Sequence, residues 1–130
     1  MDKIKILVVE DDEFLREVYN ESLVGEGYLI ETAEDGVQAM DKIKSGIYNL
    51  ILLDIILPKM SGLDVVKKLK SENTFPAKSI IVFLTNLDKE EEIKQALQLG
   101  DGYLIKSQLT PGDLIKEVQL YLSKQVSPIL

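Results

Sequence analysis

The chain has 130 residues and a formal net charge of -7, and it contains neither cysteine nor histidine. This composition excludes disulfides, thiolate metal sites and histidine general bases, and the acidic charge argues against binding to a nucleic-acid backbone. No apolar run is long enough to span a membrane, and the first residues lack the hydrophobic region of a secretory signal. We therefore expect a cytoplasmic protein with one domain over residues 1–130, in which carboxylates, hydroxyls and lysines carry any chemistry.

Short apolar runs alternate with amphipathic segments along the chain. The apolar runs predict strands over 4–9, 28–33, 50–53, 80–84 and 103–105. Apolar spacings of three and four predict helices over 14–23, 37–45, 63–71, 89–99 and 111–124. No hairpin-length turn joins successive strands, so the pattern favours a parallel α/β sheet with helices on both faces. Residues 126–130 are expected to be a frayed end or a cut toward an output domain.

Ionisable or hydroxyl side chains follow four of the five predicted strands directly. They are Glu10, Asp11, Asp12, Asp54, Thr85 and Lys106. Ligands of an open parallel sheet bind beyond the carboxyl ends of its strands, so we expect these side chains to meet at one edge. Clustered carboxylates repel one another unless they are protonated or share a cation, and hard oxygen ligands select Mg²⁺ or a similar ion. The set therefore indicates phosphoryl chemistry, with Asp54 as the nucleophile and Thr85 and Lys106 as donors to phosphoryl oxygens.

Four motifs at these strand ends resemble those of the receiver domains of bacterial two-component response regulators. They are Ile-Leu-Val-Val-Glu-Asp-Asp at 6–12, Leu-Ile-Leu-Leu-Asp-Ile-Ile-Leu-Pro-Lys-Met-Ser-Gly at 50–62, Leu-Thr at 84–85 and Tyr-Leu-Ile-Lys at 103–106. The resemblance covers about residues 3–124, taken as the core of the domain. It implies a flavodoxin-like, doubly wound sheet of five parallel strands in the order 2-1-3-4-5, with five helices.

The resemblance also implies a function. Receiver domains accept a phosphoryl group from a sensor histidine kinase or a phosphotransfer protein, here onto Asp54. They are signalling domains and not enzymes, apart from self-catalysed phosphoryl transfer and autodephosphorylation. The implied partners are a downstream effector or output domain, contacted through the fourth and fifth helices, or a second copy of the chain. Neither nucleic acid nor membrane is expected to bind directly.

The family's metal site carries over residue by residue. Asp54 and Asp11 match direct ligands of Mg²⁺ or Mn²⁺, and Glu10 matches a ligand that acts through water. The backbone carbonyl of Ile56 matches a third contact. Asp12 lies one position beyond the acidic pair, and we expect it to cap a helix. A structural N-cap is the best alternative role for Asp54.

The family's switch residues match Thr85, Lys106 and Tyr103. By resemblance the Thr85 hydroxyl turns toward the phosphoryl group, Lys106 pairs with it, and Tyr103 swings inward. Taken alone, Thr85 is consistent with an ordinary strand-end hydroxyl and Lys106 with a surface lysine. Tyr103 is equally consistent with a place in the core.

Three positions depart from the family pattern. Ser107 stands where the family has proline, so we expect a trans peptide bond after Lys106. The segment 100–103 is one residue short because it lacks an alanine, which could change the packing of the fourth helix. Asn86 is larger than the small residue common after the threonine and is expected to affect access to an acyl phosphate.

Three rival functions fit the residues less well. A phosphohydrolase of the haloacid-dehalogenase type has a second aspartate at the position of Ile56. A nucleotide-binding module would need a Gly-x-x-x-x-Gly-Lys run, which the chain lacks. A pseudo-receiver that serves only as a scaffold would have lost an acidic, acceptor, hydroxyl or lysine position, and all four are kept.

Overall fold

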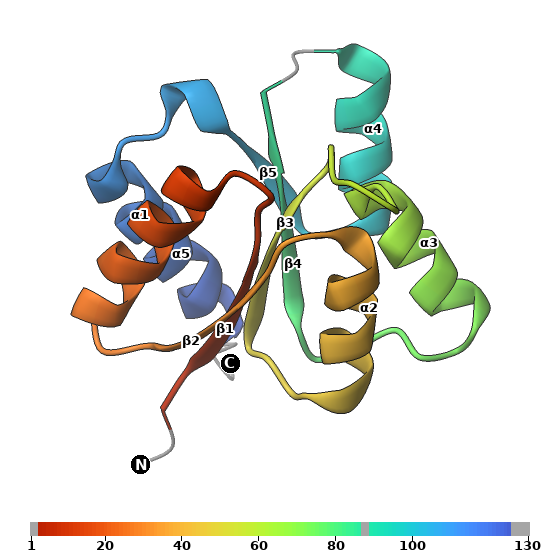
Figure 1. Ribbon diagram of the computed structural model, residues 1–130, viewed down its shortest axis with the longest axis horizontal. Coiled ribbons are helices and arrows are strands. Elements are labelled where there is room, and N and C mark those ends of the chain that lie inside the picture. The colour runs from red at the N-terminus through yellow and green to blue at the C-terminus, as the bar shows by residue number, and fades with distance from the viewer. Residues whose placement is uncertain (1–2, 87–88, 126–130) are drawn as a thin grey trace, which may run out of the picture.

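A central parallel sheet runs through the computed structural model, which describes residues 3–86 and 89–125 (Figure 1). Its strands are β1 (Lys5–Val9), β2 (Leu29–Ala33), β3 (Leu50–Asp54), β4 (Ile80–Thr85) and β5 (Gly102–Ile105). They lie in the order β2-β1-β3-β4-β5, and every neighbouring pair is parallel. The predicted fold class and strand order are therefore confirmed. The frayed end expected at 126–130 falls outside the described residues.

Helices cover both faces of this sheet. They are α1 (Glu13–Gly25), α2 (Gly36–Ser45), α3 (Gly62–Ser71), α4 (Glu90–Leu99) and α5 (Pro111–Gln125). Helices α1 and α5 contact each other on one face, while α2, α3 and α4 lie side by side on the other (Figure 1). None of the described helices combines the length and the apolar character needed to cross a membrane.

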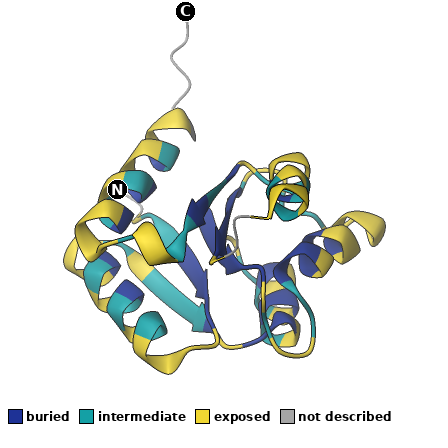
Figure 2. Cartoon of the chain, turned by 90° about the horizontal axis from the view of Figure 1, so that it is seen from above, coloured by how far each residue is buried: buried dark blue, intermediate teal, exposed yellow. Residues whose placement is uncertain are grey.

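Two apolar cores lie between the sheet and its helices because successive strand residues face opposite sides. On β1, Leu7 and Val9 face the core under α2, α3 and α4, whereas Ile6 and Val8 face the core under α1 and α5. Every residue of β3 and β4 is buried, as the dark interior of Figure 2 shows. Strands covered on both faces read as continuous apolar runs, which is why the sequence predicted them.

The ends of the helices follow from local capping. Asp12 precedes α1 and accepts a hydrogen bond from the backbone N–H of Leu15 at 2.9 Å, which confirms its predicted capping role. Ser61 caps α3 in the same way, so α3 begins at Gly62, one residue before the predicted start. A short 3₁₀ helix, Lys106–Gln108, follows β5 directly. The sequence did not predict this turn, because three residues are too few to show an apolar period.

The segment that leads into β5 is held against β4. The backbone N–H of Asp101 donates to the carbonyl of Ile81 at 2.7 Å, and the N–H of Ile81 donates to Oδ2 of Asp101 at 2.8 Å. A Cβ at Gly100 would lie 2.8 Å from the ring of Phe83, so this close approach requires glycine. No described peptide bond is cis, in agreement with the trans bond expected before Ser107.

Candidate functional site

Three charged side chains from three strand ends meet at the carboxyl edge of the sheet. Glu10 follows β1, Asp54 is the last residue of β3, and Lys106 follows β5. The Nζ atom of Lys106 lies 2.7 Å from Oδ2 of Asp54 and 2.9 Å from Oε1 of Glu10. The parallel order places these strand ends side by side, although 96 positions separate Glu10 from Lys106 in the sequence. The predicted convergence is therefore present.

Burial sets the electrostatics of this group. Glu10 is fully buried and Asp54 is 3% exposed, so two carboxylates share one ammonium away from bulk water. Burial is the main cause that raises the pKa of Glu10 to about 7, and the hydrogen bond from Lys106 opposes it. Burial alone would lower the pKa of Lys106, but its hydrogen bonds to Asp54 and Glu10 raise that pKa above its usual value. The group is therefore short of positive charge.

A third carboxylate completes an acidic cluster. Asp11 is exposed, and it offers a carboxylate oxygen that lies within 4.8 Å of oxygens of Glu10 and Asp54. Three hard oxygen donors with no nitrogen or sulfur ligand match the preference of Mg²⁺ or Mn²⁺. Lys106 supplies one positive charge against three carboxylates, so the donor set fits a divalent cation.

The cluster opens to solvent through a small cavity of about 170 Å³. Its lining residues are Asp11, Asp54, Ile56, Asn86 and Lys106. The backbone N–H of Ile56 donates to Oδ1 of Asp54 at 3.2 Å, while Oδ2 receives the Lys106 ammonium. Both oxygens of Asp54 are therefore oriented, and the cavity gives a small ligand access to them. Asn86 borders this opening, as its predicted effect on access requires.

Neither of the two predicted switch residues lines this cavity. Thr85 ends β4 and is 2% exposed. Tyr103 pairs with Phe83 across β4 and β5, and its half-buried ring packs against the core under α2, α3 and α4. It also lines a separate cavity of about 440 Å³ between β5 and α5. The structure brings Thr85 to the same edge as Asp54, and the switching roles of both residues stay predictions.

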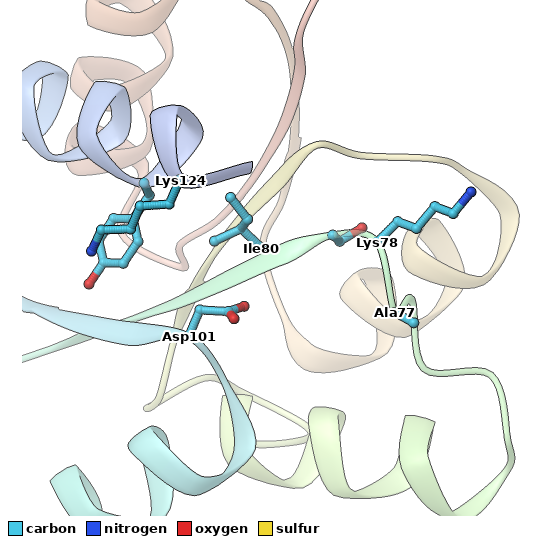
Figure 3. Close-up of a pocket in the computed structure, with 7 residues that line it drawn as sticks. Ala77, Lys78, Ile80, Asp101 and Lys124 are labelled. Atoms are coloured by element: carbon cyan, nitrogen blue, oxygen red, sulfur yellow. The ribbon is translucent and has the colours of Figure 1, made fainter. Parts of the chain in front are cut away.

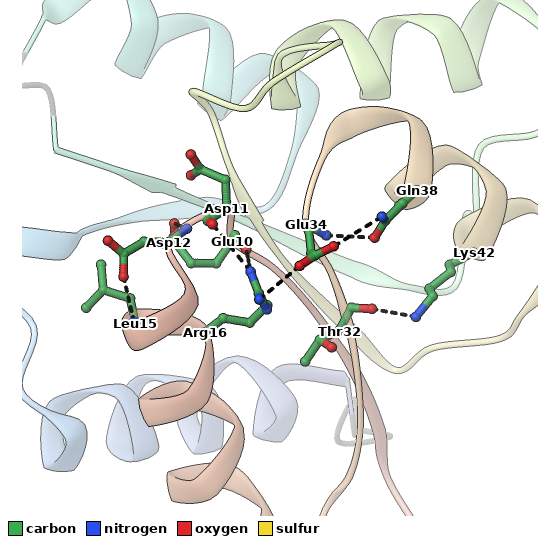
Figure 4. A network of polar contacts seen from close by, with 9 residues as sticks. All are labelled: Glu10, Asp11, Asp12, Leu15, Arg16, Thr32, Glu34, Gln38 and Lys42. Atoms are coloured by element: carbon green, nitrogen blue, oxygen red, sulfur yellow. Dashed lines mark hydrogen bonds and ion pairs between the residues drawn. The ribbon is translucent and has the colours of Figure 1, made fainter.

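Arg16 is a residue of this region that the sequence analysis missed (Figure 4). From the first turns of α1 its guanidinium donates to the backbone carbonyl of Glu10 at 2.9 Å and to that of Asp11 at 3.4 Å. It also pairs with Glu34 at 3.1 Å. The planar guanidinium thus fixes the loop that carries two of the clustered acids. The only sequence signal was that Arg16 is the single arginine of the chain.

A second pocket lies at the opposite end of β4 (Figure 3). It has a volume of about 330 Å³, and its charged lining residues are Lys78, Asp101 and Lys124. Asp101 already accepts the N–H of Ile81, and the ammonium of Lys124 stacks over the ring of Tyr121 at 5.0 Å. The pocket therefore gathers no reactive set comparable with that around Asp54.

The fold and the acidic edge together define a class, the CheY-like α/β signalling domains. The family model described as "Response regulator receiver domain" matches residues 6–119. The chain belongs to this family of two-component signalling domains.

Relatives with curated descriptions agree with this assignment. The chain is 32% identical over 117 residues to the chemotaxis protein CheY of Halobacterium salinarum, covering 88% of this chain and 95% of that protein. It is also 32% identical over 117 residues to the transcriptional regulatory protein DltR of Streptococcus agalactiae, covering 90% of this chain and 51% of DltR. The chain thus spans about half the length of the transcriptional regulators that it matches.

Solved structures show the same fold. The CheY-like receiver domain protein of Methanospirillum hungatei superposes with a TM-score of 0.86 at 28% identity, covering 95% of this chain and 97% of that one. The response regulator TrrA of Thermotoga maritima, solved in complex with Mg²⁺-BeF, has a TM-score of 0.76 at 34% identity. That comparison covers 92% of this chain and 98% of TrrA.

Proposed function

We propose that the chain is a phospho-accepting receiver domain in which Asp54 takes a phosphoryl group in a Mg²⁺-dependent reaction. The observation that carries this proposal is the contact of Lys106 with both Asp54 and Glu10, beside the exposed carboxylate of Asp11. The fold does not need an ammonium and three carboxylates gathered from three strand ends, because a single ion pair would stabilise it with a smaller desolvation cost.

The residues that would hold the cation are Glu10, Asp11, Asp54 and the backbone carbonyl of Ile56. Their oxygens suit Mg²⁺ or Mn²⁺, and TrrA, a relative by structure, was solved with Mg²⁺-BeF. A bound divalent cation supplies the positive charge that offsets the repulsion between these carboxylates and an incoming phosphoryl group. Asp11 is the exposed member and would admit the ion from solvent.

In the transfer step an Asp54 oxygen forms the bond to phosphorus. The bond from phosphorus to the donor imidazole nitrogen breaks, its electron pair stays on the imidazole, and that nitrogen takes a proton from solvent. The ammonium of Lys106, which already contacts Asp54 at 2.7 Å, is placed to donate to a phosphoryl oxygen. The Ile56 N–H holds the other Asp54 oxygen and so limits rotation of the carboxylate.

The signalling consequences follow from the neighbouring strands. Thr85 at the end of β4 would turn its hydroxyl toward the phosphoryl group, and Tyr103 on β5 would move inward in response. The donor would be a sensor histidine kinase or a phosphotransfer protein. The changed surface, formed with α4 and α5, would engage an effector, an output domain or a second copy of the chain. We assign one receiver domain to residues 1–130, with its core at 3–124, acting in the cytoplasm without direct contact to nucleic acid or membrane.

Intact-mass spectrometry with a small phosphodonor and Mg²⁺ tests the acceptor. We expect the wild type to gain the mass of one phosphoryl group, and Asp54→Asn to gain none because the amide is a poor nucleophile. Asp41→Asn, an exposed position on α2, is the matched control and should react as the wild type does. A phosphoryl gain in Asp54→Asn equal to that of the wild type would show that another residue is the acceptor.

A further inference from the structure

The loop from β3 to α3 carries part of the proposed metal site, and a backbone hydrogen bond from Gly62 closes the loop where α3 begins. Ile56, the proposed carbonyl ligand, lies in this loop two residues after Asp54. At the end of the loop, the N–H of Gly62 donates to the carbonyl of Ile55 at 2.8 Å. A Cβ at Gly62 would lie 2.2 Å from the backbone oxygen of Asp54. The loop therefore closes on the backbone of the acceptor residue itself.

A second attachment holds the middle of the loop to the start of α2. The N–H of Gly36 donates to the carbonyl of Pro58 at 3.2 Å. Oδ2 of Asp35 lies 3.4 Å from Nζ of Lys59. A Cβ at Gly36 would lie only 2.0 Å from the backbone oxygen of Met60, so no larger residue fits without moving the loop.

The attached part of the loop is strained. Lys59 has a φ of 69°, a left-handed conformation that non-glycine residues rarely adopt. The N–H of Met60 turns back to the carbonyl of Pro58 at 2.7 Å. Such a conformation persists only where the surroundings impose it, and the start of α2 is in contact with this turn on both sides of Lys59.

We propose that Gly36 is a positioning residue for the metal-binding part of the site. Its missing side chain lets the start of α2 hold the β3–α3 loop, and that loop sets the position of the Ile56 carbonyl relative to Asp54. This inference rests on the proposed function, because Mg²⁺ is the ligand whose binding Gly36 affects. The nearest atoms to a Cβ at Gly36 all belong to Met60 of the loop, two of them backbone atoms and one its Cβ, so the residue acts on loop geometry.

Amide hydrogen exchange of the wild-type protein tests this coupling without any substitution. If the loop and the metal are coupled, a bound ion must in turn hold the loop against α2. We expect saturating Mg²⁺ to slow exchange of the Gly36 N–H by at least about fivefold. The Gly46 N–H, which bonds to the Lys42 carbonyl at the other end of α2, is the internal control and should not change.

The outcome of this measurement separates the two proposals. Mg²⁺ binding detected by calorimetry with no change at Gly36 would overturn the positioning role and leave the proposed function intact. Absence of Mg²⁺ binding to the wild type would overturn both, and the failure would then lie in the metal site.

A matched pair of substitutions gives the second test. Gly36→Ala should weaken Mg²⁺ binding by about tenfold, the usual effect of removing a residue that orients a ligand. Its phosphorylation rate should recover toward that of the wild type as Mg²⁺ is raised. Gly25→Ala at the end of α1, where a Cβ would meet nothing within 4 Å, should bind Mg²⁺ as the wild type does. A folded Gly36→Ala variant with unchanged Mg²⁺ affinity would contradict the inference, and if that variant fails to fold the exchange measurement decides.

Discussion

Two lysines on this sheet pair with carboxylates in very different surroundings. Lys5 on β1 lies 2.6 Å from Glu31 on β2, and the two side chains are 34% and 39% exposed. Lys106 pairs with Glu10 and Asp54, and its side chain is 10% exposed while those of its partners are 0% and 4% exposed. In the first pair one ammonium balances one carboxylate, and both are in contact with water. In the second group one ammonium faces two buried carboxylates.

The difference appears in the direction of the pKa shifts. Hydrogen bonds from Lys5 and then from Tyr48 lower the pKa of Glu31. Burial raises the pKa of Glu10 to about 7 although Lys106 contacts it. An exposed ion pair stabilises the sheet only modestly. A buried group in which carboxylates outnumber ammonium groups is stabilised when it binds a cation. The carboxylates beside Lys106 therefore differ from the Lys5–Glu31 pair in burial and charge balance, without reference to any motif.

Removal of each lysine should give the largest contrast. Lys106→Met leaves Glu10 and Asp54 buried without their cation, and we expect a loss of about 3 kcal/mol in the free energy of unfolding. Lys5→Met exposes Glu31 to water and should cost less than about 1 kcal/mol. Urea unfolding in a chelator measures both. Equal losses of unfolding free energy in the two variants would contradict the proposed difference between the Lys5 and Lys106 ion pairs.

Mg²⁺ should stabilise only through the acidic edge. At a tenfold excess over the dissociation constant, it should add about 1.4 kcal/mol to the free energy of unfolding of the wild type. Asp11→Ala should lose this increment. Asp12→Ala is the neighbouring control, since it should lose about 1 kcal/mol of helix capping and still respond to Mg²⁺. A full Mg²⁺ response in Asp11→Ala would refute its role as a ligand.

The two glutamates should give pH dependences of opposite sign in the absence of metal. The folded pKa of Glu31 is lowered, so its contribution is present above its ordinary pKa of 4.5 and is lost as the pH falls below that value. The folded pKa of Glu10 is raised, so its contribution is present below 4.5 and is lost as the pH rises toward about 7.

Glu31→Gln and Glu10→Gln should each remove one of these dependences. Chemical unfolding of the two variants at a series of pH values measures the change. For the partly exposed Glu31 we expect an effect below about 1 kcal/mol. A Glu10→Gln variant that keeps the wild-type slope between pH 4.5 and 7 would show that another group titrates there.

Much of the fold could be predicted from the sequence because its signals are local. The apolar runs of β3 and β4 reflect burial on both faces, and the helix periods reflect one apolar side. The site residues could be placed at one edge because parallel strands end together. The ends of helices were predicted less closely, as the start of α3 shows, because a single capping residue such as Ser61 determines where a helix begins.

Other features depend on contacts that no local pattern encodes. The sequence by itself determined the alternation of strands and helices and the residues at the strand ends. Only the tertiary structure decided that Glu10 is fully buried while its neighbour Asp11 is exposed, that Arg16 holds their backbone, and that Gly36 touches Met60. The physical reason is that periodicity records which side of an element is buried, whereas pairings between distant residues arise when several elements pack together.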